Sequence, residues 1–243
     1  MSGKPELDGL PENADLAFLR LLHLADSGLP VGTLAHSFGL ESLAAAGLLA
    51  PPGLPDFFRG HLEEAGMVDA VFCREAFRLG RQSEEMFSFD RWIEINDRLS
   101  ALKAARESRA GSAALGQHFV VAVLGVADCS LLREAWEATR RAHAVVHHCT
   151  AFGLTVSVLG IEEEQAVTGY LHQATAALVS ACQRLLPIGQ SEALRVLWNL
   201  KPVMRETARR SREYKIDDVS CFMPLLDWGA MEHPALSTRL FIS

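Results

Sequence analysis

Apolar side chains recur at three- and four-residue steps along almost the whole chain, which is the spacing of amphipathic helices. Trp92, Ile95, Leu99 and Leu102 show this spacing clearly. Runs of alternating apolar and polar residues, which are typical of strands, are missing from the sequence. We therefore predict an all-α protein, a single bundle of about eight to ten helices. The predicted helices span residues 16–25, 36–48, 55–80, 89–110, 113–127, 131–148, 151–159, 162–186 and 192–212.

The last part of the chain departs from this pattern. Pro224, Gly229 and Pro234 exclude a long helix there, yet the segment is rich in large apolar side chains. Such side chains need cover, either from the chain's own domain or from a partner. We therefore divide the chain into a flexible N-terminal segment (1–14), an all-α domain (15–216) and an irregular, partner-binding C-terminal tail (217–243). The apolar tail residues are Phe222, Leu225, Leu226, Trp228, Met231, Leu240 and Phe241.

Composition limits the function classes. Of 243 residues, 49% are hydrophobic and 22% charged, and the formal net charge is −7. This apolar content argues against a disordered chain, and the acidic balance gives no support to nucleic-acid binding. Residues 142–161 are uncharged and long enough to span a membrane, but three histidines favour a buried helix. Without a secretion signal or a cysteine framework, we expect a cytoplasmic protein that does not contact a membrane.

Two local patterns point to chemistry, and each has a simpler structural interpretation. Ser37 lies in a near match to the Gly-x-Ser-x-Gly turn of serine hydrolases, but that turn needs a preceding strand. A helix cap is the favoured role for Ser37. His143 and His147 are four residues apart in a predicted helix and could share a metal ion with Cys149. Histidines of a buried or interfacial helix are the favoured interpretation.

A basic cluster near residue 210 stands out in this acidic chain. Arg205 and Arg209 lie at the end of a predicted helix with Lys201, and further basic residues follow. They fit a surface for an acidic partner or a phosphate. They fit equally well a solvated helix end, where cations interact favourably with the helix dipole.

Four segments, taken in order, resemble the UreF family of urease accessory proteins. Residues 26–41 are similar to its N-terminal signature, in which a Leu-Pro-x-Gly turn precedes Ser-x-Gly-Leu-Glu. Residues 96–116 are similar to its central helices, and residues 184–190 resemble its Pro-x-Gly-Gln break. Residues 224–243 look like its C-terminal signature. Two departures are the Leu34–Ser37 stretch, where bacterial members usually carry Phe-Ser-Tyr-Ser, and Pro234.

The resemblance implies an all-α, homodimeric factor without catalytic residues. It would join UreD (also called UreH) and the GTPase UreG on apo-urease and assist nickel insertion, with a regulatory role toward the GTPase. Nickel would be handled by the complex, with no cofactor held firmly by this chain. A serine hydrolase using Ser37 and a nickel carrier using His143, His147 and Cys149 remain the alternatives. The residues expected to bind partners are Leu29, Pro30, Gly32, His36, Ser37, Gly39, Glu41, Arg205, Arg209, Asp227, Met231, Glu232, His233, Arg239, Leu240 and Phe241.

Overall fold

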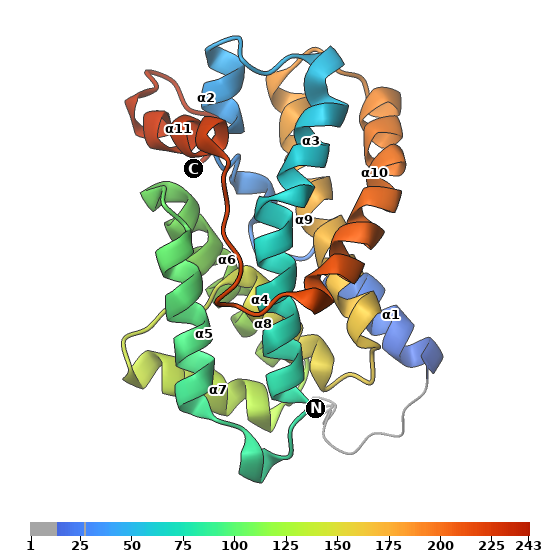
Figure 1. Ribbon diagram of the computed structural model, residues 1–243, viewed down its shortest axis with the longest axis vertical. Helices are drawn as coiled ribbons and strands as arrows, with labels where there is room; N and C mark the ends of the chain where they lie inside the picture. The colour runs from blue at the N-terminus through green and yellow to red at the C-terminus, as the bar shows by residue number, and fades with distance from the viewer. Residues whose placement is uncertain (1–13, 27) are drawn as a thin grey trace.

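The computed structural model describes residues 14–26 and 28–243, and within them it contains helices and turns but no β-strand (Figure 1). The all-α prediction is confirmed. The predicted flexible segment lies outside the described residues except for Ala14. The helices are α1 (Ala14–Leu24), α2 (Leu40–Ala45), α3 (Leu54–Glu63), α4 (Ala65–Gly80), α5 (Phe89–Leu102), α6 (Arg106–Val126), α7 (Ser130–Arg141), α8 (His148–Ser157), α9 (Glu163–Leu185), α10 (Gln190–Arg210) and α11 (Pro224–Glu232).

Helix α8 forms the centre of the bundle. All ten of its residues are buried, and it packs against α4, α6 and α9. The predicted buried helix within residues 142–161 is therefore confirmed. Among the described residues, no helix is both long and apolar enough to span a membrane.

Two glycines allow the helices around α8 to approach closely. A Cβ atom at Gly153 of α8 would overlap the carbonyl oxygen of Cys73 on α4. At Gly116 of α6, a Cβ atom would overlap the carbonyl oxygen of Val146. Backbone therefore meets backbone where α8 crosses α4 and where α6 meets the residues just before α8, and side chains larger than hydrogen are excluded at both contacts.

Several predicted helix boundaries are wrong. The predicted helix 36–48 is reduced to α2, because Phe38 (φ 50°) and Gly39 (φ 96°) adopt left-handed conformations just before it. The predicted helix 55–80 is divided at Glu64, whose backbone (φ −107°, ψ −86°) is not helical. The predicted helix 89–110 is likewise interrupted between α5 and α6.

The predicted helix 131–148 ends at Arg141, which changes the geometry of its histidines. His143 has a φ of 54°, its N–H bonds the Arg140 carbonyl, and the Ala144 N–H bonds the Thr139 carbonyl. This pair of bonds is the Schellman ending of a helix. The prediction that His143 and His147 lie one helical turn apart is therefore wrong.

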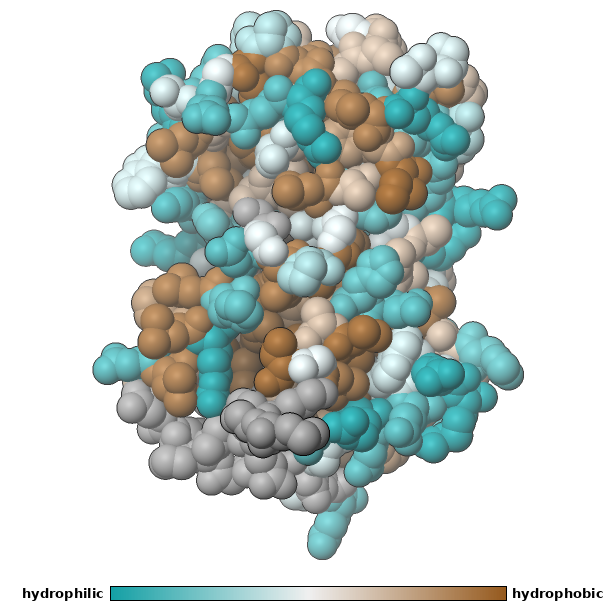
Figure 2. All heavy atoms as spheres, turned by 180° about the vertical axis from the view of Figure 1, so that it is seen from behind, coloured by the Kyte–Doolittle hydropathy of each residue, from teal (hydrophilic) through white to brown (hydrophobic). Residues whose placement is uncertain are grey.

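The C-terminal tail returns to the start of the chain. After α10 it crosses the bundle and forms the nine-residue helix α11, which packs beside α2 (Figure 1). The remaining tail is irregular apart from a short turn at His233–Ala235. Elsewhere, hydrophobic side chains are exposed over α1, at the lower left when the molecule is seen from behind (Figure 2). These are Leu16, Phe18, Leu19 and Leu22.

Gly153→Ala should destabilise the fold by about 1–3 kcal/mol, because the added methyl group forces α4 and α8 apart. Urea unfolding monitored by circular dichroism measures the effect. Gly125→Ala is the matched control, because nothing lies near its Cβ position and alanine favours a helix by about 1 kcal/mol. Equal unfolding midpoints for the two variants would contradict the close-packing argument.

Candidate functional site

The two sequence motifs at opposite ends of the chain meet at one junction between α2 and α11. An ideal Cβ atom on Gly39 would lie 2.7 Å from both the Ala230 nitrogen and the Leu226 oxygen. A Cβ atom on Gly229 would lie 2.6 Å from the Gly39 oxygen. Gly39 also has a φ of 96°, which glycine adopts without strain. Glycine is thus required at the point where the two helices touch.

The buried carboxylate of Glu41 binds the tail to α2. It accepts hydrogen bonds from the backbone N–H groups of Leu240 (2.6 Å) and Phe241 (3.1 Å). A third partner is the Nε2 atom of His233, 2.9 Å away. A buried carboxylate is costly unless it is paired and hydrogen-bonded, and these three contacts supply that pairing.

The imidazole of His233 is fully buried between two carboxylates. Its Nδ1 atom lies 2.7 Å from a Glu107 oxygen, opposite the Glu41 contact. Each ring nitrogen thus lies within hydrogen-bond distance of a carboxylate oxygen. Arg239 approaches the second Glu107 oxygen at 3.9 Å. Three elements, α2, α6 and the tail, are thereby joined through a single histidine.

The last residue of the sequence extends this junction. The N–H groups of Ser37 and Phe38 donate to the backbone oxygen of Ser243, at 2.5 and 3.1 Å. The Ser243 hydroxyl lies 2.7 Å from Nδ1 of His36, and the Ile242 N–H donates to the Ala35 carbonyl at 2.8 Å. The final residues are therefore held by backbone bonds to residues 35–38.

Ser37 has the geometry of a structural residue. Its side chain is fully buried, and its Oγ atom accepts the Glu41 N–H at 3.4 Å. The nearby His36 bonds Ser243 instead, so within the described residues Ser37 has no hydrogen bond to a histidine base. The arrangement that a serine hydrolase needs is not present at this serine.

Arg184, at the end of α9, covers the tail from outside. Its guanidinium lies 4.0 Å from the centre of the Phe241 ring, and it also donates to the Leu34 carbonyl. A cation over an aromatic face is attractive. Sequence reasoning placed Arg184 only within a resembling segment and assigned it no role.

The outer side of the tail remains apolar and uncovered. Met231, Leu240 and Ile242 are each more than half exposed, and Leu225 and Trp228 are exposed to a lesser degree. Phe241 faces inward and is buried. The tail is therefore fixed to the body on one side and presents hydrophobic side chains on the other.

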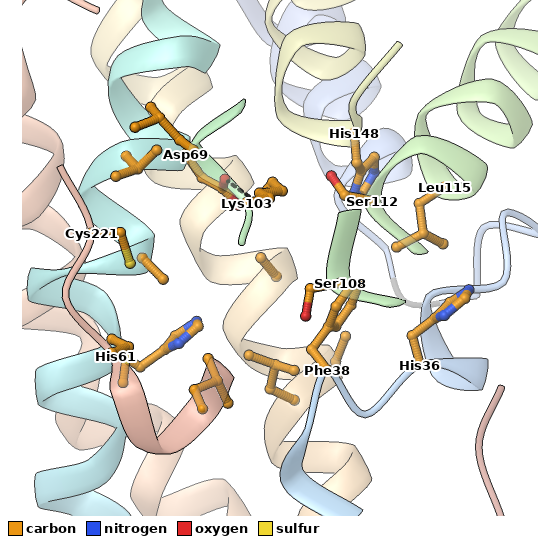
Figure 3. Close-up of a pocket in the computed structure, with 18 of the residues that line it drawn as sticks. His36, Phe38, His61, Asp69, Lys103, Ser108, Ser112, Leu115, His148 and Cys221 are labelled. Carbon is orange, nitrogen blue, oxygen red and sulfur yellow. Dashed lines mark hydrogen bonds and ion pairs between the residues drawn. The ribbon is translucent and has the colours of Figure 1, made fainter. Parts of the chain in front are cut away.

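A cavity of about 140 Å³ lies beneath the junction (Figure 3). His36 and Phe38 line one side, and Cys221 and Asp227 of the tail segment line another. Val68, Leu102 and Leu178 are among its apolar lining residues. Two predicted site residues, His36 and Asp227, thus face a common space that sequence reasoning did not foresee.

A charged pair lies in the wall of this cavity. The Lys103 ammonium is 3.0 Å from Asp69 Oδ1 (Figure 3). The Tyr170 hydroxyl donates to Asp69 Oδ2 at 3.0 Å. Burial alone would raise the pKa of Asp69, but Lys103 and the two hydrogen bonds hold it below its ordinary value. The carboxylate is therefore ionised and paired.

Two histidine nitrogens at the cavity have no protein partner. They are Nδ1 of His61 and Nε2 of His148, both on residues that line it. Burial lowers the pKa of each histidine to about 4. Both rings are therefore neutral near pH 7, and each leaves a polar atom facing the cavity.

The predicted metal candidates are not assembled into a site. Both ring nitrogens of His147 are within hydrogen-bond distance of hydroxyl groups, Ser100 at 2.8 Å and Ser112 at 3.0 Å. Cys149 is buried, which raises the pKa of its thiol well above the ordinary value, and His143 is exposed on a loop. In the part of the chain that the structure describes, no three His, Cys, Asp or Glu side chains form a metal-binding group.

The remaining predicted residues lie outside the junction. Leu29 is half-buried and Pro30 and Gly32 are exposed in the turn that precedes residues 35–38. Glu232 is exposed beside His233. The exposed Arg205 and Arg209 lie near the end of α10, and α10 is on the opposite side of the view from α11 (Figure 1). Arg209 is paired with Glu206 (2.8 Å) and Glu213 (3.2 Å).

Comparison with known proteins gives a family. The UreF family model matches residues 50–201. A relative from Bradyrhizobium sp. (strain ORS 278), named urease accessory protein UreF, is 31% identical over 95% of this chain and 94% of its own. A relative of the same name from Rhizobium johnstonii is 31% identical over 93% of this chain and 96% of its own. Another, from Bacillus sp. (strain TB-90), is 25% identical over 93% of this chain and 98% of its own.

Glu41→Ala should release the tail from the body. The substitution leaves His233 and two backbone N–H groups without their acceptor, at a cost of about 1–3 kcal/mol for each unsatisfied group. Hydrogen–deuterium exchange of residues 233–243 should accelerate accordingly. Glu232→Ala is the control, because the side chain of that neighbour is exposed and makes no hydrogen bond or ion pair within the described structure. Unchanged exchange in Glu41→Ala would contradict the role of this carboxylate.

Acid should weaken the fold through its buried histidines. Burial lowers the pKa of His147 to about 3 and that of His148 to about 4, against 6.5 in the unfolded chain. The unfolded chain therefore binds more protons as pH falls from 6.5 toward 4, and stability falls by about 1.4 kcal/mol per pH unit for each histidine. His148→Phe should reduce the slope of the unfolding free energy against pH by that amount. An unchanged slope would show that His148 is not the titrating group.

Proposed function

Because this chain belongs to the UreF family of urease accessory proteins, we propose that it is a non-enzymatic scaffold in urease maturation. In this proposal a cytoplasmic homodimer of the chain joins UreD (UreH) and the GTPase UreG on apo-urease. The assembly then inserts nickel into the urease active site. Nickel is the cargo of the whole complex, and this chain supplies binding surfaces rather than a firm metal site.

The observation that carries the proposal is the two-sided tail. Its inner side is fixed by Glu41, His233 and the Gly39–Gly229 contact, whereas Met231 and Leu240 point outward. Exposed apolar side chains on a fixed backbone favour binding, because little conformational entropy is lost when a partner covers them. We assign this outer side of the tail to UreD.

A second surface is assigned to the GTPase. Arg205 and Arg209 lie near the end of α10, whereas the residues assigned to UreD lie in and after α11, so the two assigned surfaces share no residue. Arg209 already pairs with two glutamates, so Arg205 is the more available cation. Contact with the GTPase at this position would give the chain its regulatory role.

Met231→Glu and Leu240→Glu should each weaken capture of UreD at least about tenfold, because a charge replaces an apolar contact at the interface. Co-purification with UreD, followed by a urease activation assay, measures the loss. Helicity should be unchanged, since both side chains are exposed.

Val121→Glu on α6 is the matched control, because it places the same charge at an exposed apolar position far along α6 from the junction. Deletion of residues 227–243 should abolish capture altogether. If the point variants and the deletion all bind UreD like the unaltered chain, the tail is not the binding surface.

A further inference from the structure

A stripe of four side chains runs along the exposed face of α10. Leu194 and Trp198 are 66% and 64% exposed, and they are one helical turn apart. Lys201 and Arg205 continue the same face at steps of three and four residues, and both are exposed. We call Leu194, Trp198, Lys201 and Arg205 the α10 stripe. The opposite face, with Ala193, Val196 and Leu200 among its residues, packs into the bundle.

The stripe is basic in an acidic protein. Helix α10 carries five basic and two acidic side chains, whereas the whole chain has a net charge of −7. The Lys201 ammonium lies 4.0 Å from the centre of the Trp198 ring, and such a contact is attractive without neutralising the cation. In the described part of the chain, neither Lys201 nor Arg205 has a carboxylate within ion-pair distance. The stripe therefore joins an apolar half to a cationic half that is not neutralised.

We propose that the α10 stripe binds an acidic amphipathic helix of another protein. In this complex an apolar side chain of the partner packs on Leu194 and Trp198, and its carboxylates pair with Lys201 and Arg205. The spacing matches a helix, because successive contact points on both surfaces recur every three to four residues. The proposal shares Arg205 with the surface assigned to the GTPase, but it holds for any partner of this chemistry.

Other occupants fit the stripe less well. The stripe contains no carboxylate, so the same stripe of a second copy would supply no acidic partner for Lys201 and Arg205. A nucleic acid would meet a chain whose overall charge is strongly negative. A membrane surface needs a broad apolar face, whereas this stripe carries only two apolar side chains.

The test uses the full chain and a fluorescent helical peptide of about 14 residues, which matches the roughly 20 Å length of the stripe. The peptide has leucine on one face and glutamate beside it, and a second peptide replaces each glutamate by lysine. Fluorescence anisotropy should show binding of the acidic peptide only. Trp198→Ala and Arg205→Glu should each weaken binding of the acidic peptide at least about tenfold. Arg141→Glu on α7, an exposed arginine with the same change of charge, should leave binding unaltered.

Three results would overturn the proposal. The first is failure of the acidic peptide to bind, and the second is equal binding of both peptides. In the third, the chain binds single-stranded RNA or phosphatidylserine vesicles, and this binding is weakened by the Trp198 and Arg205 substitutions, whereas binding of the peptide is not. Because the assay contains no urease component, its outcome is independent of whether the tail captures UreD.

Discussion

The arrangement of the functional end of this molecule depends on one buried carboxylate. Glu41 is separated from water, so its charge must be paired within the protein. The body of the bundle does not supply that pairing; His233 and two backbone N–H groups of the tail do. The N-terminal motif is therefore completed by residues about 200 positions later, and neither motif has its full set of hydrogen bonds alone.

This constraint explains how the tail can be held in one conformation and still leave apolar side chains exposed for a partner. The Gly39–Gly229 contact brings two backbones together, and the Glu41 bonds fix the segment that follows. The side chains directed away from that contact, Met231 and Leu240 among them, are left in solvent. The apolar excess in the composition is thus divided between a large core around α8 and surfaces that the chain does not cover.

The sequence predicts the helices well but their ends poorly, and the reasons are physical. Periodicity reports which face of a helix is buried, whereas the breaks at Phe38, Glu64 and His143 occur at residues that are neither glycine nor proline, the two strong helix breakers. Resemblance identified both motifs of the junction, but no local pattern shows that distant residues touch. The sequence did not indicate that Asp69 and Lys103 form a pair at a cavity, because isolated charges in an amphipathic helix are typical of a solvated face.

The interior shows how this chain places ionisable side chains at a largely apolar cavity. The partly buried charges of Asp69 and Lys103 are paired with each other, whereas His148 is kept neutral by burial. A neutral imidazole can remain in an apolar surrounding at a modest cost, although a charged one cannot. Part of the wall of this cavity belongs to the same tail that Glu41 holds, through Cys221 and Asp227. Any partner that repositions the tail therefore also changes the surroundings of these histidines, so the junction and the cavity are one physical unit.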